Sequence, residues 1–372
     1  MITTLERGKN AEPLYVQVAN IIRQHILSGS WRDGDSIPPE KTLCADFNIA
    51  RGTLRQALQI LENEGYLWRE QGRGTFIRSA AGFAEETNGP HQAFVVPYIR
   101  DSSVSTILVG FQQIAEEAGY SVIFNHVNNS LRQQQDVLQK LIKQGVSGIA
   151  LYPVDSESFG VINQIVRTRF PLVLVDRYLR RLTTDFVMSD HFGGALRGVH
   201  FLLDQGHERV GFISWLSPAI SMDHRLLGYT QALRERGIAL DESLLGRVEG
   251  YPTVNHTPLI DYLRSPQRPS AVFAANDQIA IALYRAAAAV GLRIPDDLSV
   301  MGFDNLDISS HLDPPLTTVA QPFLQIGRRA AELLFERIRG ESHTLQQITL
   351  ATHIVERSSV LQAAASPALA QV

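Results

Sequence analysis

Several features that define whole classes of protein are missing from this sequence. Its 372 residues include one cysteine, Cys44, which excludes an intramolecular disulfide framework. No apolar run reaches the length of a membrane-spanning helix, and the first residues lack the basic cluster and apolar segment of a secretion signal. We therefore expect a cytoplasmic protein without a membrane partner.

The short motifs of common catalytic sites are also missing. The sequence contains neither Gly-x-Ser-x-Gly nor His-Glu-x-x-His, and it has no Gly-x-x-x-x-Gly-Lys phosphate loop. His191, His200 and His207 are irregularly spaced and have no accompanying cysteines, unlike the ligands of a metal site. The sequence therefore predicts neither an enzyme nor a metal centre, and nothing in it calls for a cofactor.

A dense group of motifs is present between residues 37 and 77. Leucines at 54, 58 and 61 form one apolar stripe, which predicts a helix over residues 51–64. Gly65 follows, where a helix commonly ends in the left-handed conformation. Pro39 is suited to start the preceding helix, and residues 67–77 have the β-forming ends of a hairpin around Gly72 and Gly74. Two short helices and a hairpin are typical of a winged helix-turn-helix that reads DNA.

The side chains outside the apolar stripe have the chemistry for contact with DNA. Arg51, Arg55 and Gln56 lie off the stripe, near the start of the expected recognition helix. An arginine fork fits phosphate oxygens or the N7 and O6 edge of guanine. A solvated surface is the alternative interpretation of these arginines, and the flanking turn and hairpin favour DNA contact.

From residue 14 to residue 77 the chain resembles the GntR family of bacterial repressors. The matching residues are Pro39-Glu40-Lys41, Arg51-Gly52-Thr53-Leu54-Arg55-Gln56-Ala57-Leu58 and the Gly-Arg-Gly at 72–74. The resemblance implies that Lys41 contacts a phosphate and that Arg51, Thr53 and Arg55 contact DNA from the recognition helix. It also implies that Gly72 and Arg73 enter the minor groove. Lys41 stands where the family usually has arginine, so a bidentate contact is lost there. Ala50 stands where a serine usually caps the helix, a change that costs about 1 kcal/mol.

The charge balance predicts a dimer. The net charge is −4, and acids offset the arginines of the first 78 residues, so the head is nearly neutral. Affinity for DNA rises with the number of phosphates that the protein neutralises. Two heads bound together to double-stranded operator DNA would neutralise more phosphates than one weakly charged head can. We therefore expect a homodimer.

Beyond residue 93 the pattern changes to short apolar runs that alternate with amphipathic segments. The runs predict buried parallel strands separated by helices, first in one half of the segment and then again in the other. In the first half we expect strands at 94–96, 122–124, 148–151 and 172–175, with helices at 107–118 and 133–143. In the second half we expect strands at 210–213, 271–274 and 299–303, with helices at 192–204, 226–235 and 278–290. Two parallel sheets wrapped by helices predict two lobes with a cleft between them.

Polar residues stand at the ends of these strands, where open parallel sheets bind ligands. They are Asp176-Arg177, Asn276-Asp277 and Asp304-Asn305, and Arg225 opens the segment 225–233, from which its charge can point into the cleft. Carboxylate, amide and guanidinium groups in one cleft suit a ligand rich in hydroxyl groups. Surface pairing of Asp176 with Arg177 remains an alternative. Tyr98, Phe186 and Tyr251 are either sugar-stacking or core residues.

Over its last 270 or so residues the chain resembles the LacI/GalR regulators and the periplasmic sugar-binding proteins. The matching motifs are Asp176-Arg177, Gly206-His207-Glu208-Arg209-Val210-Gly211, Arg225-x-x-Gly-Tyr-x-x-Ala-Leu, Ala275-Asn276-Asp277, Gly302-Phe303-Asp304-Asn305 and Leu316-Thr317-Thr318-Val319-Ala320-Gln321-Pro322. The resemblance implies that Arg225, Asn276 and Asp304 hold a sugar, with Arg177 and Gln321 as further contacts. A GntR-type head joined to this domain resembles the arabinose-responsive repressors.

These observations predict an α/β protein, with a winged helix-turn-helix domain at residues 1–78, a linker at 79–91, a two-lobed periplasmic-binding-protein-like domain at 92–360 and a disordered tail at 361–372. The expected function is repression of carbohydrate-utilisation genes, relieved when a sugar binds the cleft. The alternative is an activator or co-repressed regulator that responds to a sugar phosphate or another small polar metabolite.

Overall fold

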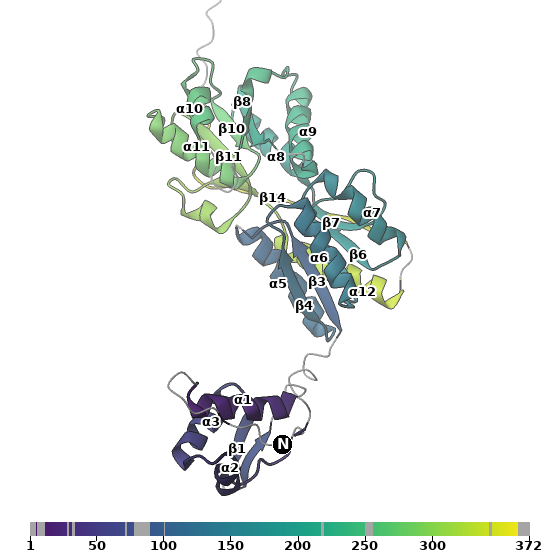
Figure 1. Ribbon diagram of the computed structural model, residues 1–372. Helices are drawn as coiled ribbons and strands as arrows, with labels where there is room; N and C mark the ends of the chain where they lie inside the picture. Colours follow the sequence, from purple (N-terminus) through teal and green to yellow (C-terminus); the bar gives the residue numbers. More distant parts are fainter. Residues whose placement is uncertain are drawn as a thin grey trace, which may run out of the picture. The chain divides into compact units, whose positions relative to one another are not determined.

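Residues 5, 12–27, 30–31, 34–70, 73–77, 90–99, 101–216, 219–249, 256–341 and 344–363 are described by the computed structural model of the chain. The contacts divide the chain into two units, Met1–Gly89 and Pro90–Val372 (Figure 1). Most of the expected linker lies outside the described residues. His91 does not belong to a linker, however, because the first strand of the second unit begins there.

The first unit is the helix-turn-helix and hairpin that the sequence predicts. Its elements are α1 (Leu14–Leu27), α2 (Glu40–Phe47), α3 (Arg51–Asn63), β1 (Leu67–Glu70) and β2 (Gly74–Ile77). The apolar stripe of α3 is buried against α1, with Leu54 and Leu61 fully inaccessible to solvent. Gly65 has a φ of +81°, so the helix ends in the conformation that glycine permits. Pro39 is the N-cap of α2 and does not occupy its first turn.

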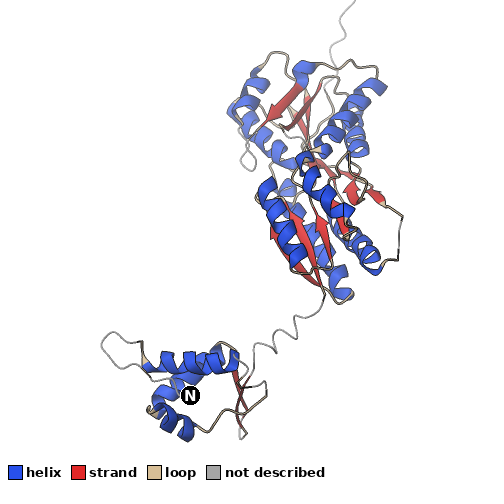
Figure 2. Ribbon diagram, turned by 45° about the vertical axis from the view of Figure 1, so that its right-hand side comes forward, coloured by secondary structure: helices blue, strands red, loops and turns tan. Residues whose placement is uncertain are grey.

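The second unit contains two lobes, each built on a sheet of six strands among the described residues (Figure 2). The first sheet runs in the order β13-β7-β6-β5-β3-β4 and is parallel throughout. The second runs in the order β14-β12-β11-β10-β8-β9, and only β14 is antiparallel to its neighbour. The fold is therefore the two-lobed α/β architecture expected from the sequence.

The first lobe contains β3 (His91–Val96), α5 (Ser102–Glu117), β4 (Ser121–His126), α6 (Leu131–Lys143), β5 (Gly148–Leu151), α7 (Phe159–Arg167), β6 (Leu172–Val175), β7 (Asp185–Ser189), α12 (Phe323–Arg339) and β13 (Gln347–Leu350). The second lobe contains α8 (His191–Asp204), β8 (Val210–Trp215), α9 (Ile220–Glu235), β9 (Leu245–Val248), α10 (Thr257–Arg264), β10 (Ala271–Ala274), α11 (Asp277–Ala289), β11 (Ser299–Asp304), β12 (Thr317–Ala320) and β14 (His353–Val355). Every residue of β5, β6 and β10 is buried, as expected for parallel strands covered on both faces.

The chain returns to the first lobe after it has built most of the second. Helix α12 packs against α5 and β6, and β13 adds an edge strand beside β7. Two glycines permit the close approach of α12 and α5. A Cβ at Gly110 would meet the carbonyl oxygen of Leu324, and a Cβ at Gly327 would meet that of Ile107.

The start of the expected disordered tail is ordered by hydrogen bonds to the second lobe. The amide of Leu361 donates to Ser299 Oγ at 3.1 Å, and the amide of Ala363 donates to the carbonyl oxygen of Gln205 at 2.7 Å. The prediction was therefore wrong for residues 361–363, and the remainder of the tail lies outside the described residues. No helix in the described ranges is long and apolar enough to cross a membrane.

Candidate functional site

One candidate site is the outer surface of the first unit. Arg51, Arg55 and Gln56 are exposed on α3, and Thr53 is half-buried beside them. Lys41 is exposed on α2, the helix that precedes the tight turn. The structure thus brings these predicted DNA contacts onto two adjacent helices of one domain.

Two of the arginines already have carboxylate partners within the protein. Arg55 Nε lies 3.3 Å from Glu40 Oε2, and Arg73 Nη1 donates to Glu70 Oε1 at 2.8 Å. Arg73 precedes β2 at the tip of the hairpin, where Gly74 has a φ of +130°. Gly72, the other expected contact at this tip, lies outside the described residues. Ala50 is the N-cap of α3 and offers no side-chain cap, as its identity predicts.

The second candidate site is a cavity of about 400 Å³ between the two lobes of the second unit. All five predicted sugar contacts line it: Arg177, Arg225, Asn276, Asp304 and Gln321. They lie at or just beyond the carboxyl ends of β6, β10, β11 and β12, except Arg225, which lies on α9. Each lobe therefore contributes polar groups to the same cleft, at the edge where parallel sheets bind ligands.

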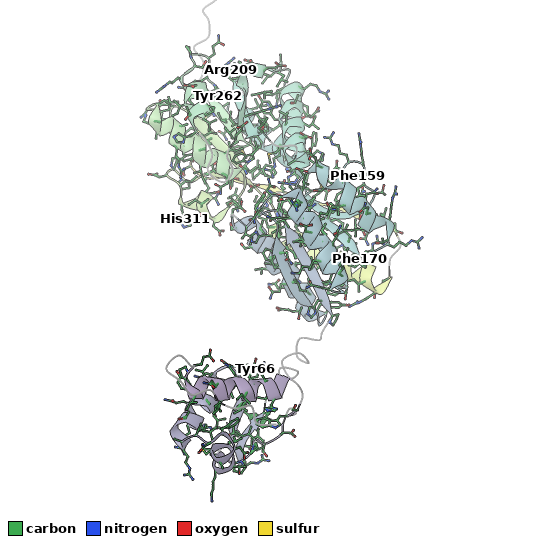
Figure 3. All side chains as sticks on the ribbon, viewed as in Figure 1. Tyr66, Phe159, Phe170, Arg209, Tyr262 and His311 are labelled. Carbon is green, nitrogen blue, oxygen red and sulfur yellow. The ribbon has the colours of Figure 1, made fainter. Side chains whose placement is uncertain are left out.

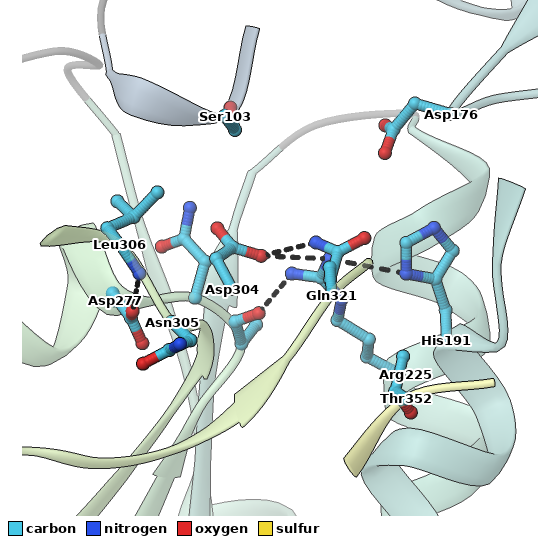
Figure 4. Close-up of polar contacts among 12 residues, drawn as sticks. Ser103, Asp176, His191, Arg225, Asp277, Asp304, Asn305, Leu306, Gln321 and Thr352 are labelled. Carbon is cyan, nitrogen blue, oxygen red and sulfur yellow. Dashed lines mark hydrogen bonds and ion pairs between the residues drawn. The ribbon is translucent and has the colours of Figure 1, made fainter. Parts of the chain in front are cut away.

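Arg225 is held in place from several directions at the base of this cavity. Its side chain is 4% exposed, and Nη1 donates to the carbonyl oxygen of Ala275. Nη2 lies 3.3 Å from both Asp304 Oδ1 and His191 Nδ1 (Figure 4). The guanidinium carbon is 3.8 Å from the ring centroid of Phe303, a cation–π distance. Its orientation is therefore fixed before any ligand binds.

Asp304 accepts hydrogen bonds from two other residues of the cavity, Arg225 and Gln321. Gln321 Nε2 donates to Asp304 Oδ1 at 2.6 Å, and Arg225 contacts the same oxygen. Burial raises the pKa of Asp304 well above its usual range, although the charge of Arg225 acts in the opposite direction. Gln321 Oε1 is buried and has no hydrogen-bond partner among the described residues. The cavity thus contains an acceptor, Gln321 Oε1, that receives no hydrogen bond from the described residues.

Asn276 and Asp277 have different roles although they are neighbours. Asn276 Oδ1 caps α11 by accepting from the amide of Ile279 at 3.0 Å, which leaves its NH₂ group as the donor available to the cavity. Asp277 is fully buried and accepts from Leu306 N, Ser309 Oγ and Thr318 Oγ1. Burial raises its pKa to about 6, against these hydrogen bonds. Asp277 therefore joins α11 to β12 and does not line the cavity.

The first lobe supplies an arginine packed among tyrosines. Arg177 Nη1 donates to the carbonyl oxygen of Val154 at 2.7 Å, and its guanidinium carbon lies 4.9 Å from the ring centroid of Tyr152. Its Nε is 4.0 Å from Asp176 Oδ2. The side chains of Asp176 and Arg177 are 7% and 12% exposed and line the cleft, so the alternative of a pair on the outer surface was wrong.

Further cavity residues were not assigned from the sequence. Among them are Asp101, Ser103, Asn129, Tyr152, Asp155, Trp215, Ser221, Met222, Glu249 and Phe323. Tyr152 and Trp215 stand at the ends of strands that were expected, so the strand-end rule could have identified them. Tyr98 lines the cavity, whereas Phe186 packs on Tyr178 with ring centroids 5.0 Å apart, and Tyr251 lies outside the described residues.

A second cavity of about 490 Å³ adjoins the first and shares Asp155, Arg177 and Ala219 with it. Phe159, labelled in Figure 3, lies on its first-lobe side. The lobes meet here through Arg180 and Asp223, whose charged atoms are 3.0 Å apart. Within the described ranges, no three His, Cys, Asp or Glu side chains are grouped so that they could hold a metal ion.

Comparisons with known protein families match both units. Residues 14–77 match the gntR family of bacterial regulatory proteins, and residues 199–360 match the periplasmic binding protein-like domain. The arabinose metabolism transcriptional repressor of Geobacillus stearothermophilus is 30% identical over 339 residues, which cover 89% of this chain and 92% of that protein. The similarity therefore includes the head and both lobes.

Two further comparisons cover 66% and 74% of the chain. The HTH-type transcriptional repressor CytR of Escherichia coli strain K12 is 32% identical over 247 residues, or 66% of this chain and 72% of that protein. A solved structure of a LacI family transcriptional regulator from Enterococcus faecium with bound ribose aligns with a TM-score of 0.65 at 25% identity. That alignment covers 74% of this chain and 100% of the other.

Proposed function

Because the chain belongs to the family of transcriptional regulators that join a GntR-type DNA-binding head to a LacI-type, periplasmic-binding-protein-like domain, we propose that it represses carbohydrate-utilisation genes until an uncharged sugar occupies its cleft. The observation that carries this proposal is the convergence of Arg177, Arg225, Asn276, Asp304 and Gln321 on one cavity. These side chains offer both donors and acceptors, as a ligand rich in hydroxyl groups requires.

The charges of the cavity favour a neutral sugar over a sugar phosphate. Among its described lining residues are five carboxyl groups, from Asp101, Asp155, Asp176, Glu249 and Asp304, and two guanidinium groups, from Arg177 and Arg225. A phosphate would add a charge of about −2 to a site where acids outnumber bases. The aromatic rings of Tyr98, Tyr152, Trp215 and Phe323 supply apolar faces for the carbon skeleton of a sugar.

The names of the relatives suggest which sugars to examine first. One relative acts in arabinose metabolism, and one structural relative holds ribose. A pentose is therefore our first choice of effector. We place the protein in the cytoplasm, where it would act on operator DNA as a homodimer and would regulate without catalysing a reaction.

A thermal-shift screen tests the proposed ligand. We would use the full chain with L-arabinose, D-ribose, D-glucose and D-ribose 5-phosphate, each at several concentrations. A sugar at one hundred times its dissociation constant adds about 2.7 kcal/mol to the free energy of unfolding. We expect at least one neutral sugar to raise the melting temperature and the phosphate to have no effect. Stabilisation by the phosphate alone would contradict the proposal.

A further inference from the structure

His191 is the first residue of α8, at the point where the chain passes from β7 in the first lobe into the second lobe. Its side chain is fully buried, and its ring centroid lies 5.9 Å from that of Phe303. The proposed function does not use this histidine. It lies where the chain passes between the lobes, and it contacts Arg225, an arginine that lines the cavity.

The contact with Arg225 fixes the state of the imidazole ring. Arg225 Nη2 is a donor, and it lies 3.3 Å from His191 Nδ1. A guanidinium has no acceptor, so Nδ1 must accept the hydrogen bond and carry no proton. The neutral ring then holds its proton on Nε2. Burial and the charge of Arg225 both lower the pKa of His191 well below its usual value, which keeps the ring neutral.

The other ring nitrogen is left without a partner. His191 Nε2 is buried, and no atom among the described residues completes a hydrogen bond with it. Asp176, from the end of β6 in the first lobe, lies on the Nε2 side of the ring in Figure 4. The backbone of Asp176 acts to raise the pKa of His191, although no hydrogen bond to Nε2 forms among the described residues. A buried donor without a hydrogen-bond partner is unfavourable, so a lobe movement that supplies an acceptor is favoured.

Since His191 contacts the second lobe through one nitrogen and faces the first through the other, we propose that it is a positioning residue that couples Arg225 to Asp176 across the cleft. This inference rests on the proposed function. His191 Nδ1 orients Arg225 for the ligand, and His191 Nε2–H gains Asp176 as its acceptor when the lobes close. A ligand that engages Arg225 is thereby linked to the closed form, which it stabilises by its difference in affinity for the two forms.

Two substitutions separate the two halves of this role. The amide of His191→Asn can reach the place of Nδ1 and accept from Arg225, but it does not extend toward Asp176. The longer His191→Gln places its amide near Nε2 and removes the acceptor for Arg225. With L-arabinose and D-ribose as probes, we expect His191→Gln to weaken sugar binding about tenfold, the loss of one hydrogen bond to a charged group. His191→Asn should retain affinity within about threefold, since the Arg225 bond persists.

Lobe closure is the second measurement. Spin labels on cysteines introduced at Lys140 and Arg293, in Cys44→Ser protein, report the distance between the first and second lobes. The sugar should shorten this distance in the His191 parent and shorten it less in His191→Asn. Equal sugar affinity and equal closure in the parent and both variants would overturn the proposal.

A measurement without sugar keeps the inference separate from the proposed function. Long-range proton–nitrogen NMR of the free full chain, with His191→Asn used for assignment, distinguishes the two neutral tautomers and the protonated ring. We expect the Nε2–H tautomer at pH 7. A ring protonated on Nδ1, or on both nitrogens, would overturn the proposal whichever ligand the cleft takes. A sugar panel without any binder would instead contradict the proposed function and leave the tautomer as the test of His191.

Discussion

Arg55 on α3 and Glu40 on α2 form an ion pair across the tight turn of the head, with Arg55 Nε 3.4 Å from Oε1 and 3.3 Å from Oε2 of the carboxylate. The arginine side chain is 65% exposed in this pair. An exposed ion pair contributes little to stability, so Glu40 constrains the direction of Arg55 more than it stabilises the fold. We therefore expect Arg55 to approach DNA in a restricted set of orientations.

Replacing Arg55 with alanine should weaken operator binding by about 1–3 kcal/mol, because the side chain is placed to read a base edge or contact a phosphate. Sugar binding should not change, since Arg55 belongs to the first unit. Gel-shift titration measures the first effect, and the thermal-shift assay measures the second. Arg293→Ala is a matched control, because Arg293 is an exposed arginine of the second lobe that also pairs with a carboxylate. Unchanged operator affinity in Arg55→Ala would refute the role.

Replacing Asp304 with glycine should abolish the response to sugar while leaving operator binding intact. Asp304 has a φ of +120°, a conformation that glycine adopts without strain, so the substitution removes the carboxylate at little backbone cost. Arg225 and Gln321 then lose their shared acceptor. Operator binding with and without sugar provides the measurement. Release of the variant from DNA at the same sugar concentration as the parent would show that Asp304 does not contact the ligand.

The intact protein should form a homodimer through the second unit and read a pseudopalindromic operator. A nearly neutral head supplies few phosphate contacts, and a two-fold protein matches a two-fold site. Sedimentation of the full chain with an operator fragment tests this expectation. A complex that contains only one copy of the chain would rule it out.

Gly327→Ala should lower the free energy of unfolding by about 1–3 kcal/mol, the usual cost of overpacking. The new Cβ would collide with the backbone of α5 at Ile107 and Phe111, which cannot yield as a flexible side chain would. Gly160→Ala is the matched control, because Gly160 lies in α7 and a Cβ added there would have no atom within 4 Å beyond its chain neighbours and its own helix. There, alanine should stabilise the helix by up to about 1 kcal/mol. Urea unfolding distinguishes the two, and equal effects would contradict the packing argument.

The contribution of His191 to stability should depend on pH. The pKa of His191 is lowered in the folded protein, whereas it is about 6.5 in an unfolded chain. Below pH 6.5 the unfolded chain takes up a proton that the folded protein does not, so stability falls by up to about 1.4 kcal/mol per pH unit. Asp277, with a pKa raised to about 6, acts in the opposite direction between pH 6 and about 3.9, because the folded protein is protonated first.

Comparison of the parent with His191→Asn isolates the histidine, since the effect of Asp277 is common to both proteins. Urea unfolding at pH 7, 6 and 5 should show the stability of the parent falling relative to that of the variant as the pH is lowered. A constant difference across this range would mean that His191 does not titrate differently in the folded and unfolded protein.

Most of the fold could be predicted because its strands are continuous apolar runs. The expected strands at 148–151, 172–175 and 271–274 coincide with β5, β6 and β10. Strands β7, β9, β12, β13 and β14 were missed, because each is a run of five residues or fewer that includes polar residues. The return of α12 to the first lobe could not be derived either, because the helix pattern of 323–339 does not indicate which sheet it covers.

The candidate sugar site was predicted where a polar residue ends an apolar strand. Asp304 and Asn276 follow this rule, and the structure brings them to one cavity. The rule does not report what else each side chain binds, so the capping role of Asn276 and the pairing of Arg55 with Glu40 were not foreseen. His191 was weighed only as a metal ligand, because its contact with Arg225 joins residues 34 positions apart.

Because the chain returns to the first lobe near its end, neither lobe of the second unit is complete until late in synthesis. The first lobe lacks α12 and β13 until translation has passed residue 350, and the second lobe lacks β14 until residue 355. The described elements of the head, in contrast, are complete in sequence at residue 77, and its core among the described residues includes none beyond that point. Since domains fold as units from the N-terminus during synthesis, a cell making this protein acquires the DNA-reading unit long before the unit that senses the ligand.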